Sequence, residues 1–568
     1  MDHGAGVPAA RGTDVTPPRR SSDGAEASST AVGTGQTFSF ENETVIDTRT
    51  WAFNNAPWDQ QKVVTVGDYQ YVPYWDHAGR LSLARRNLRD DTVQTIHFDW
   101  TVPDEDSHRN TAIGTDDDGR LHVTYDHHDD PFHYRHSSTG FLTKPPSSIA
   151  TGDFSENTDM GLRGTEAPVT YPRFFNDPTG TLYCEYRIGS SGDGNSSLHV
   201  HDSASNSWTR VGMVFSGDGT YGPWDDSTSR NAYHHDWTFD DSGRLHVTWT
   251  WRETWETWRS NHDVHYAYSD DGGDTWYDND GALVGDVTAN DPIRVDDGGV
   301  VVDAPVDSWL VNQGTQALDS DDQPHIFTSR STNATTDLGD ANRHYVHYWR
   351  TTDGQWHEQY IDDTAVDLSN VGIEPTRADD ILLNRDGLLF DADDTLHVYT
   401  VVDERLYAGV ATASSGWTDW TIYCLHEGPI TGMDGRKHDA RRWEDAGVLS
   451  IPLERPSESG TKFVIQEYSL GATTVPAAPT LSVSRTASTA VALSWTEARG
   501  AVSYTVYRRP LGGRFAVVES GVARNSFFTQ YTDTSIDPGT DYEYGVEAVN
   551  SAGGNGSNVV RTTTDRTG

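Results

Sequence analysis

Residues 240–249, DDSGRLHVTW, show the pattern that decides the fold: an Asp/Gly turn followed by an alternating β-strand. Variants recur at 66–75 (VGDYQYVPYW), 116–125 (DDDGRLHVTY), 177–186 (DPTGTLYCEY), 319–328 (DSDDQPHIFT), 391–400 (DADDTLHVYT) and 445–453 (DAGVLSIPL). Successive copies lie about 50 to 80 residues apart, which is enough for a four-stranded blade. Because no segment keeps a helical period, the seven copies predict an all-β chain folded as a seven-bladed β-propeller.

Residues 269–276, SDDGGDTW, fit the Asp-box pattern S-x-D-x-G-x-T-W. This motif holds the turn between two outer strands of a propeller blade, with its tryptophan, here Trp276, in the blade core. Such turns lie away from the binding face of a propeller. The motif therefore supports the fold and predicts no chemistry.

The C-terminal part of the chain has a different pattern. After the Pro/Ala-rich stretch 470–479, the segments around Trp495, 504–507 and 542–550 alternate as in a fibronectin type III β-sandwich, which this region resembles. We predict a disordered leader at 1–36, the propeller with the catalytic site at 37–470, a linker at 471–476 and a fibronectin type III module at 477–568.

The chain is strongly acidic, with 42 Lys+Arg against 86 Asp+Glu and a formal net charge of −44. From residue 475 onward eight acidic residues balance eight basic ones, so the whole excess lies in the earlier part. The 19 Trp, 25 Tyr and 17 Phe exclude a disordered chain, because they can form a core. An acidic surface over an aromatic core predicts a protein adapted to high salt; the alternative is an ordinary acidic extracellular protein.

Composition also limits the partners. No basic stripe is available for phosphates, so nucleic acid is not expected, and no stretch approaches the about 18 apolar residues of a membrane helix. Cys184 and Cys424 make neither a disulfide framework nor a cysteine-type zinc site. Arg19-Arg20 lacks the apolar segment of an export signal. The fibronectin-like module nevertheless favours a secreted or cell-surface protein, and we expect a monomer.

Residues 106–137 form the first of three chemically unusual stretches, with six histidines. His122 lies inside the repeated strand and recurs as His246 and His397, so we interpret it as a packed blade residue. His108 and His128 bracket one strand and its turn, and would lie at blade ends, where propellers place their pockets. This pair is the better candidate for function.

The second stretch, 170–197, contains Tyr171 before a proline and Arg187 at the end of the next predicted strand. An arginine beside a Gly/Ser loop can bind a carboxylate through its two-pronged guanidinium. The third stretch, within 231–276, places several polar groups at predicted blade ends as candidates for substrate binding. They are Tyr233, His234, Arg252, Asn261 and His262.

The segments TYPRFF (170–175), YRIGSSGDG (186–194), WTWRET (249–254) and NHDVHYAYSDDGGDTW (261–276), with 116–137 and 312–325, resemble the BNR-repeat propeller family. That family includes ulvan-type polysaccharide lyases. The resemblance covers about residues 40–470 and implies a seven-bladed propeller that β-eliminates uronate-containing polysaccharides in a central cleft. It implies that His108 and His128 are the two active-site histidines, Tyr171 the catalytic tyrosine and Arg187 the residue that neutralises the substrate carboxylate.

This chain departs from the family pattern next to the second histidine, where Asp129 replaces the usual asparagine. His127 lies directly beside His128, so either ring could face the substrate, and we include His127 among the substrate-binding candidates. His108 and Tyr171 can supply the base and the acid of an elimination, and the residues alone leave open which does which.

We therefore expect a polysaccharide lyase acting on an anionic, ulvan-like polysaccharide. The alternatives are a glycoside hydrolase on the same propeller and a non-catalytic glycan-binding propeller. The elimination requires no cofactor. A structural calcium or zinc ion is possible, but no spacing of Asp or His identifies a metal site.

Overall fold

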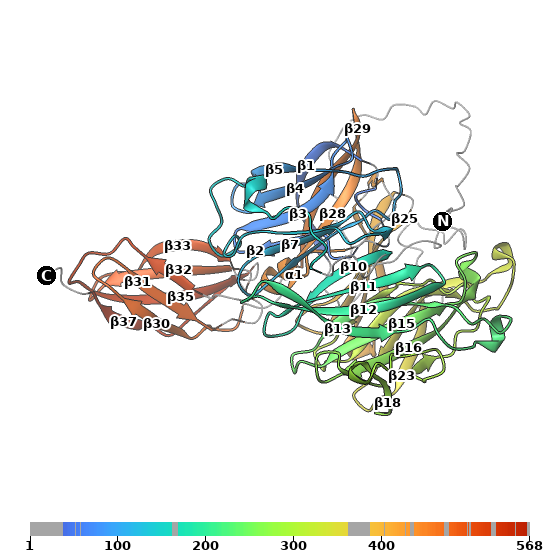
Figure 1. The fold of residues 1–568 in the computed structure, drawn as a ribbon. Helices are drawn as coiled ribbons and strands as arrows, with labels where there is room; N and C mark the ends of the chain where they lie inside the picture. The colour runs from blue at the N-terminus through green and yellow to red at the C-terminus, as the bar shows by residue number, and fades with distance from the viewer. Residues whose placement is uncertain are drawn as a thin grey trace, which may run out of the picture.

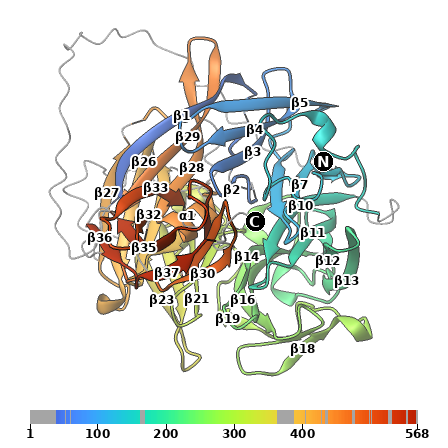
Figure 2. The same cartoon turned by 90° about the vertical axis from the view of Figure 1, so that its left-hand side faces the viewer.

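The computed structural model describes residues 38–564, apart from 52, 57, 59, 162–167, 362–386, 403, 427, 432–436, 471–475, 497, 499, 500, 502, 524–529, 551 and 552. The predicted leader and almost all of the predicted linker lie outside these residues. Figures 1 and 2 show two parts: a ring of sheets, coloured blue to orange along the chain, and a smaller C-terminal sandwich in red. None of the described helices is long and apolar enough to cross a membrane.

Seven antiparallel sheets form the ring within the described part of residues 38–470, which confirms the seven-bladed propeller. In chain order they contain β2–β5 (Val64–Val66, Tyr69–Trp75, Arg80–Asn87, Val93–Thr101); β6, β7 and β9 (Thr111–Thr115, Leu121–Tyr125, Tyr134–His136); β8 and β10–β13 (His128–Asp130, Val169–Asn176, Leu182–Ser190, Asp193–Asp202, Ser207–Phe215); β14–β19 (Asn231–Phe239, Leu245–Arg252, Asn261–Ser269, Thr275–Tyr277, Leu283–Asp286, Val300–Val302); β20–β23 (Thr315–Leu318, Pro324–Ser331, Arg343–Arg350, Trp356–Ile361); β24–β27 (Gly387–Phe390, Thr395–Val402, Arg405–Thr412, Trp420–His426); and β1, β28 and β29 (Phe38–Thr50, Val448–Ser457, Gly460–Leu470).

The repeated Asp/Gly turns join the first two strands of a blade. In the copy that begins at Asp240, one carboxylate oxygen accepts the backbone N–H groups of Ser242 and Arg244, at 2.9 and 2.8 Å. Asp177 makes the same pair of bonds in its own turn. The aspartate thus satisfies backbone donors that the turn leaves without a strand partner. The seventh copy differs, because the short helix α1 (Ala440–Ala446) precedes β28 there in place of a strand.

The ring closes between the two ends of the propeller sequence. Strand β1 pairs with β29, and β29 pairs with β28, so the first strand completes the last sheet. Glu43 of β1 forms ion pairs with Arg455 of β28 and with Lys462 of β29. These ion pairs therefore add to the backbone hydrogen bonds between the strands that close the ring.

The Asp box behaves as predicted. The Asp271 carboxylate accepts hydrogen bonds from the backbone N–H and the hydroxyl of Thr275, at 2.9 and 2.6 Å. The Trp276 side chain is fully buried and packs edge-on against Trp237. The motif is thus part of the core of the β14–β19 blade.

The C-terminal sandwich has two sheets. One contains β30, β31 and β34 (Leu481–Thr486, Val491–Trp495, Gln530–Asp533), and the other contains β32, β33, β35, β36 and β37 (Ser503–Pro510, Ala516–Ala523, Asp541–Asn550, Gly553–Gly556, Val560–Thr563). Trp495 and Tyr504 lie in a separate apolar core between them. In the propeller, Cys184 and Cys424 lie on different blades and form no disulfide with each other.

Candidate active site

The four residues predicted to be catalytic lie together, although they come from four segments of the chain. His108 precedes β6, His128 opens β8, Tyr171 lies on β10 and Arg187 on β11. The rings of His108 and His128 stack with centroids 4.2 Å apart, and the ring of Tyr171 lies 6.3 Å from that of His108. The guanidinium carbon of Arg187 lies 5.2 Å from the centre of the Tyr171 ring. Two imidazoles, one phenol and one guanidinium therefore share a single site.

A break in the β10 ladder presents Tyr171 to this site. The pairing of β10 with β11 shifts register between Thr170 and Arg173, and Tyr171 has a left-handed backbone with φ of 57°. Pro172 has no N–H to donate to the ladder, which favours such a bulge. A positive φ is unfavourable for a bulky residue by about 1–3 kcal/mol, and it is typical of functional positions.

Asp106 joins the two histidines, and sequence reasoning did not select it. One of its carboxylate oxygens lies 2.9 Å from Nδ1 of His108, and the other lies 2.5 Å from Nδ1 of His128. Burial alone would raise the pKa of Asp106, but the hydrogen bonds from the two histidines outweigh it and hold that pKa well below its usual range. Since a carboxylate only accepts, both Nδ1 atoms carry protons, and in the neutral form of each ring Nε2 holds the lone pair.

The loop that carries Asp106 and His108 is anchored from two sides. Arg109 forms ion pairs with Asp104 on the same loop, with Asp126 directly after β7 and with Asp130 at the end of β8, at 2.6 to 2.7 Å. The indole of Trp58 donates to the Ser107 carbonyl, and its ring stacks on His108 at 4.3 Å. The imidazole is thus held in place before any substrate binds.

Arg187 is buried, with 4% of its surface exposed, and it has two neighbours at its tip. Its Nη2 lies 3.1 Å from a carboxylate oxygen of Asp129, and its Nη1 lies 3.5 Å from the Tyr233 hydroxyl. Asp129 is the position where this chain departs from the family pattern. Burial would lower the pKa of Arg187, but Tyr233, Tyr171 and Asp129 outweigh it and raise that pKa, so the group stays cationic.

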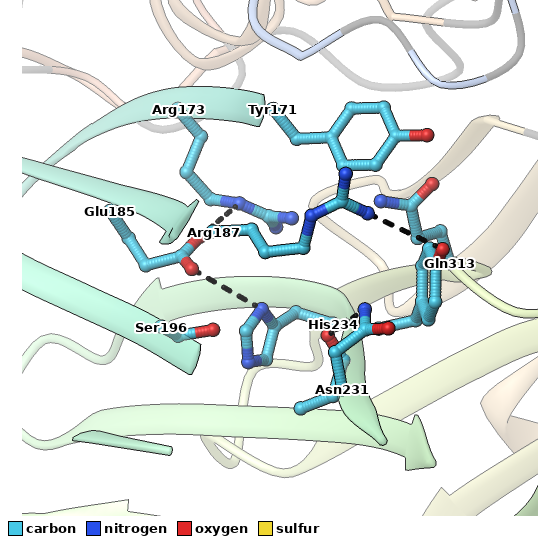
Figure 3. Close-up of a pocket in the computed structure, with 10 residues that line it drawn as sticks. Tyr171, Arg173, Glu185, Arg187, Ser196, Asn231, His234 and Gln313 are labelled. Carbon is cyan, nitrogen blue, oxygen red and sulfur yellow. Dashed lines mark hydrogen bonds and ion pairs between the residues drawn. The ribbon is translucent and has the colours of Figure 1, made fainter. Parts of the chain in front are cut away.

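Tyr171 and Arg187 line a small pocket, and Figure 3 shows the residues that surround it. Arg173 and Glu185 form a buried ion pair at 3.0 Å, and Glu185 lies 3.6 Å from Nδ1 of His234. Burial raises the pKa of Glu185 to about 7 and lowers that of His234 well below its usual value. Sequence reasoning missed the other polar groups that line the pocket: Arg173, Glu185, Ser196, Asn231 and Gln313.

The remaining predicted binding residues divide into two groups. Tyr233 and His234 line the pocket, and the Arg252 guanidinium lies 5.8 Å from the centre of the Tyr233 ring. His127, Asn261 and His262 are at most 1% exposed. The structure therefore does not bring these three into contact with a ligand in the pocket.

Each of the three buried residues has a partner inside the protein. Nε2 of His127 accepts the backbone N–H of His133 at 2.8 Å, so His128 is the ring of this pair that faces the site. Asn261 donates to the Leu310 carbonyl. His262 stacks on Tyr221 at 3.7 Å and contacts Glu253 at 3.0 Å.

Asp106, His108 and His128 also have donor types that suit a metal ion, and their ligand atoms lie within 4.8 Å of one another. Both Nδ1 atoms, however, lie at hydrogen-bond distance from the carboxylate. A metal at those atoms would have to displace two protons. The cluster therefore fits an arrangement that orients two imidazoles better than a metal site.

Two curated relatives share significant sequence similarity with the chain. It is 22% identical over 412 residues to the ulvan lyase, long isoform, of Alteromonas sp., covering 64% of this chain and 37% of the relative. It is 23% identical over 307 residues to the ulvan lyase, short isoform, of Alteromonas sp. (strain LOR), covering 43% of this chain and 55% of the relative. The chain thus spans between about a third and about a half of the length of these relatives.

Solved structures support the fold. The crystal structure of the polysaccharide lyase Uly1 matches with a TM-score of 0.55 at 16% identity, over 76% of this chain and 99% of that one. A PL25 ulvan lyase matches with a TM-score of 0.50 at 13% identity, over 74% and 94%. The model of the BNR repeat-containing family matches residues 69–364, more than half of the chain, and the fibronectin type III model matches 476–564. The chain therefore belongs to the BNR repeat-containing family and carries a C-terminal fibronectin type III domain.

Proposed function

We propose that this protein is a polysaccharide lyase that cleaves an anionic, uronate-containing polysaccharide of the ulvan type by β-elimination. The observation that carries the proposal is the grouping of His108, His128, Tyr171 and Arg187 beside one pocket. The similarity to the Alteromonas ulvan lyases supports the same reaction and substrate class. These groups are the ones that an elimination next to a carboxylate requires.

The reaction removes the C5 proton of the uronate and breaks the bond between C4 and the glycosidic O4. The electron pair of the C5–H bond becomes the C4=C5 double bond, and the departing O4 takes a proton from an acid. Negative charge develops on the uronate carboxylate as C5 loses its proton. The Arg187 guanidinium is suited to stabilise that charge, because it is buried, cationic and forked.

The proton positions favour one division of roles. Asp106 accepts from Nδ1 of both imidazoles, so Nε2 of His108 presents the lone pair that a base needs. The Tyr171 hydroxyl has a proton to give and serves as the acid for O4. His128 stacks on His108, and the next residue, Asp129, contacts Arg187, so His128 is placed to assist Arg187 in binding the carboxylate.

The test is incubation of the purified protein with ulvan and other uronate polysaccharides while ultraviolet absorbance is recorded. The new C4=C5 double bond is conjugated with the carboxylate and absorbs in the ultraviolet, so we expect absorbance to rise together with new reducing ends. Tyr171→Phe should lower kcat by about 10³-fold, in the range of lost acid–base catalysis. Tyr268→Phe is the matched control, because Tyr268 lies on β16, next to the Asp box and away from the pocket.

Three results would contradict the proposal, or one part of it, in different ways. Chain cleavage without ultraviolet absorbance would indicate a glycoside hydrolase on the same propeller. Tight binding of the polysaccharide without any cleavage, unchanged in Tyr171→Phe, would indicate a binding propeller. Full activity of Tyr171→Phe would show that the phenol takes no part in the reaction.

We also propose that the enzyme works outside the cell in concentrated salt and needs no metal for the elimination itself. The net charge of −44 supports the salt requirement, since self-repulsion at low ionic strength destabilises a compact acidic protein. Melting temperature and activity should both rise as KCl increases from about 0.1 M to about 2 M. A protein whose stability is unchanged over that range would contradict the salt requirement, and activity lost in EDTA would contradict the metal-independent chemistry.

A further inference from the structure

A pair of aspartate and histidine side chains recurs in the blades, six residues apart. The turn aspartate accepts a hydrogen bond from Nε2 of a buried histidine on the following strand. The pairs and distances are Asp240 with His246 at 3.3 Å, Asp319 with His325 at 3.3 Å and Asp391 with His397 at 3.0 Å. In these copies the carboxylate faces the imidazole of its own blade and fixes the turn to the strand.

The copy at Asp116 and His122 is different, because a second imidazole faces the aspartate itself. His201, from β12 of the next blade, directs Nδ1 toward Oδ2 of Asp116 at 3.6 Å, while Nε2 of His122 lies 3.2 Å from the same oxygen. All three side chains are at most 1% exposed. Neither nitrogen has a hydrogen-bond partner among the described residues.

A chain of hydrogen bonds decides where His201 carries its proton. Nδ1 of His136 lies 2.9 Å from the Ser137 carbonyl and must donate to it, so Nε2 of His136 accepts from the Asn206 amide nitrogen at 3.3 Å. The Asn206 oxygen then accepts from Nε2 of His201 at 3.2 Å. Neutral His201 therefore directs a bare lone pair at a carboxylate, and two acceptors face each other in a buried space.

A cation between these groups would resolve that conflict, because each group is an electron-pair donor. From this geometry we propose that Asp116, His122 and His201 form a buried zinc site. Zinc bonds to histidine nitrogen and carboxylate oxygen of about 2.0–2.2 Å in a tetrahedron require ligand atoms about 3.3–3.5 Å apart. The two measured separations, 3.2 and 3.6 Å, bracket that value, and all three ligand atoms lie within 4.8 Å of one another.

The charges around the cluster are compatible with a divalent ion. Arg120 donates to Oδ2 of Asp116 at 2.8 Å and brings one positive charge to the cluster. It also contacts the Asp118 carboxylate at 3.4 Å and donates to the Ser203 carbonyl at 3.0 Å. Two carboxylates against one guanidinium leave the surroundings net negative before a metal binds.

The site would also be a cross-link. Asp116 and His122 belong to the blade of β6, β7 and β9, whereas His201 belongs to the blade of β8 and β10–β13. Those two blades carry His108, His128, Tyr171 and Arg187 on or beside their strands. Zinc would therefore stabilise the blade pair on which the proposed active site is built, without contacting the substrate.

The experiment measures zinc in the full chain, expressed in zinc-supplemented medium and dialysed, by plasma mass spectrometry. We expect about one zinc per chain in the wild type and about one-tenth of that in His201→Ala, because two remaining ligands bind zinc weakly. His246→Ala is the matched control: it removes an equivalent buried imidazole from an Asp–His pair that, within the described residues, has no second histidine at its aspartate, and zinc should be retained. His201→Cys, which restores a zinc ligand, should retain it as well.

The wild type offers a readout that does not depend on any variant. Cobalt loaded in place of zinc should show the intense visible bands of a tetrahedral site, and removal of the metal by a chelator should lower the melting temperature. A wild-type protein without zinc or cobalt bands overturns the proposal. So does zinc that persists in His201→Ala and disappears in Asp106→Asn, since the metal would then lie at the other cluster. Lyase activity enters none of these readouts, so the two proposals fail separately.

Discussion

The Asp129 carboxylate lies 3.1 Å from the Arg187 guanidinium, so the group proposed to bind the substrate carboxylate already has an anionic partner. Asp129 has a left-handed backbone with φ of 61°, and its oxygen also accepts from the Thr170 hydroxyl at 3.1 Å. A uronate that enters the site must share Arg187 with this aspartate. High salt would lower the cost of bringing two carboxylates to one guanidinium, because it screens their repulsion.

Asp129→Asn should therefore strengthen substrate binding. The amide keeps an oxygen for the Thr170 hydroxyl but removes the competing charge, and we expect KM to fall by about 3- to 10-fold. Initial rates against polysaccharide concentration measure the effect, and Asp241→Asn, an exposed turn residue in another blade, controls for the change of net charge. An unchanged or higher KM in Asp129→Asn alone would show that the aspartate does not compete with substrate.

Asp106→Asn should reduce kcat with little change in KM. Asparagine has one acceptor oxygen where Asp106 uses two, so one of the two Nδ1–H groups would face an N–H donor and its ring would turn or change tautomer. We expect kcat to fall about 10²-fold and KM to stay within about twofold, as for a positioning residue.

The control for this variant is Asp104→Asn, on the same loop. Asp104 contacts Arg109 at 2.6 Å, whereas it is Asp106 that holds the two imidazoles. If both variants lost the same activity, the order of the loop would be responsible and not the orientation of the rings. If Asp106→Asn lost nothing, the bridging carboxylate would have no part in the reaction.

The ring closure should be sensitive to acid through Glu43. Burial alone would raise its pKa, but hydrogen bonds from Lys462, Gln466 and Arg455 outweigh it and lower that pKa from 4.5 to about 2. A lowered pKa stabilises the fold fully above pH 4.5, and that stability is lost as the pH falls toward 2.

Glu43→Gln should therefore be less stable than the wild type at pH 7, by up to about 3 kcal/mol from the size of the shift, and the difference should shrink between pH 4.5 and 2. Urea unfolding at a series of pH values measures this. Glu41→Gln is the control, since Glu41 is an exposed residue of the same strand that contacts the Ser469 hydroxyl. A difference that is constant with pH would mean that the ionised form of Glu43 does not stabilise the closure.

The Asp box should affect stability and not catalysis. Asp271→Ala removes the acceptor for the Thr275 backbone N–H and hydroxyl, which should lower the free energy of unfolding by about 1–3 kcal/mol. Asp270→Ala removes only an exposed ion pair with Arg244 and should change it by less than about 1 kcal/mol. Specific activity well below the melting temperature should be equal in both variants, and a loss of activity in Asp271→Ala would place this turn in the catalytic machinery.

Much of the architecture could be predicted from local patterns. The turn aspartates, such as Asp177 and Asp240, bond to backbone groups within four residues, so a short stretch of sequence contains the whole interaction. The same applies to the Asp box and to the alternation of the strands. Each of these contacts joins residues that are close together in the sequence. Because the same contact recurs in several blades, the sequence shows it as a repeated pattern.

Only part of the candidate active site could be predicted from such local sequence patterns. His108, His128, Tyr171 and Arg187 could be selected because they lie at blade ends and match a family pattern, and the structure brings them together. Their relation to Asp106 and Asp129 was not visible. Asp129 could be recognised as a departure from the family pattern but its contact with Arg187 could not, and Asp106 has no distinguishing mark among the many aspartates of an acidic chain.

The amino-acid sequence by itself determined the number of blades, the turns and the types of groups available for chemistry. Only the tertiary structure decided that His128 and not His127 faces the site, that Asn261 and His262 are buried, and that His201 meets Asp116. Neighbours in a strand point to opposite faces, and a bulge such as the one at Tyr171 reverses that alternation. Contacts between blades depend on how whole sheets pack around the ring, which no local stretch of residues encodes.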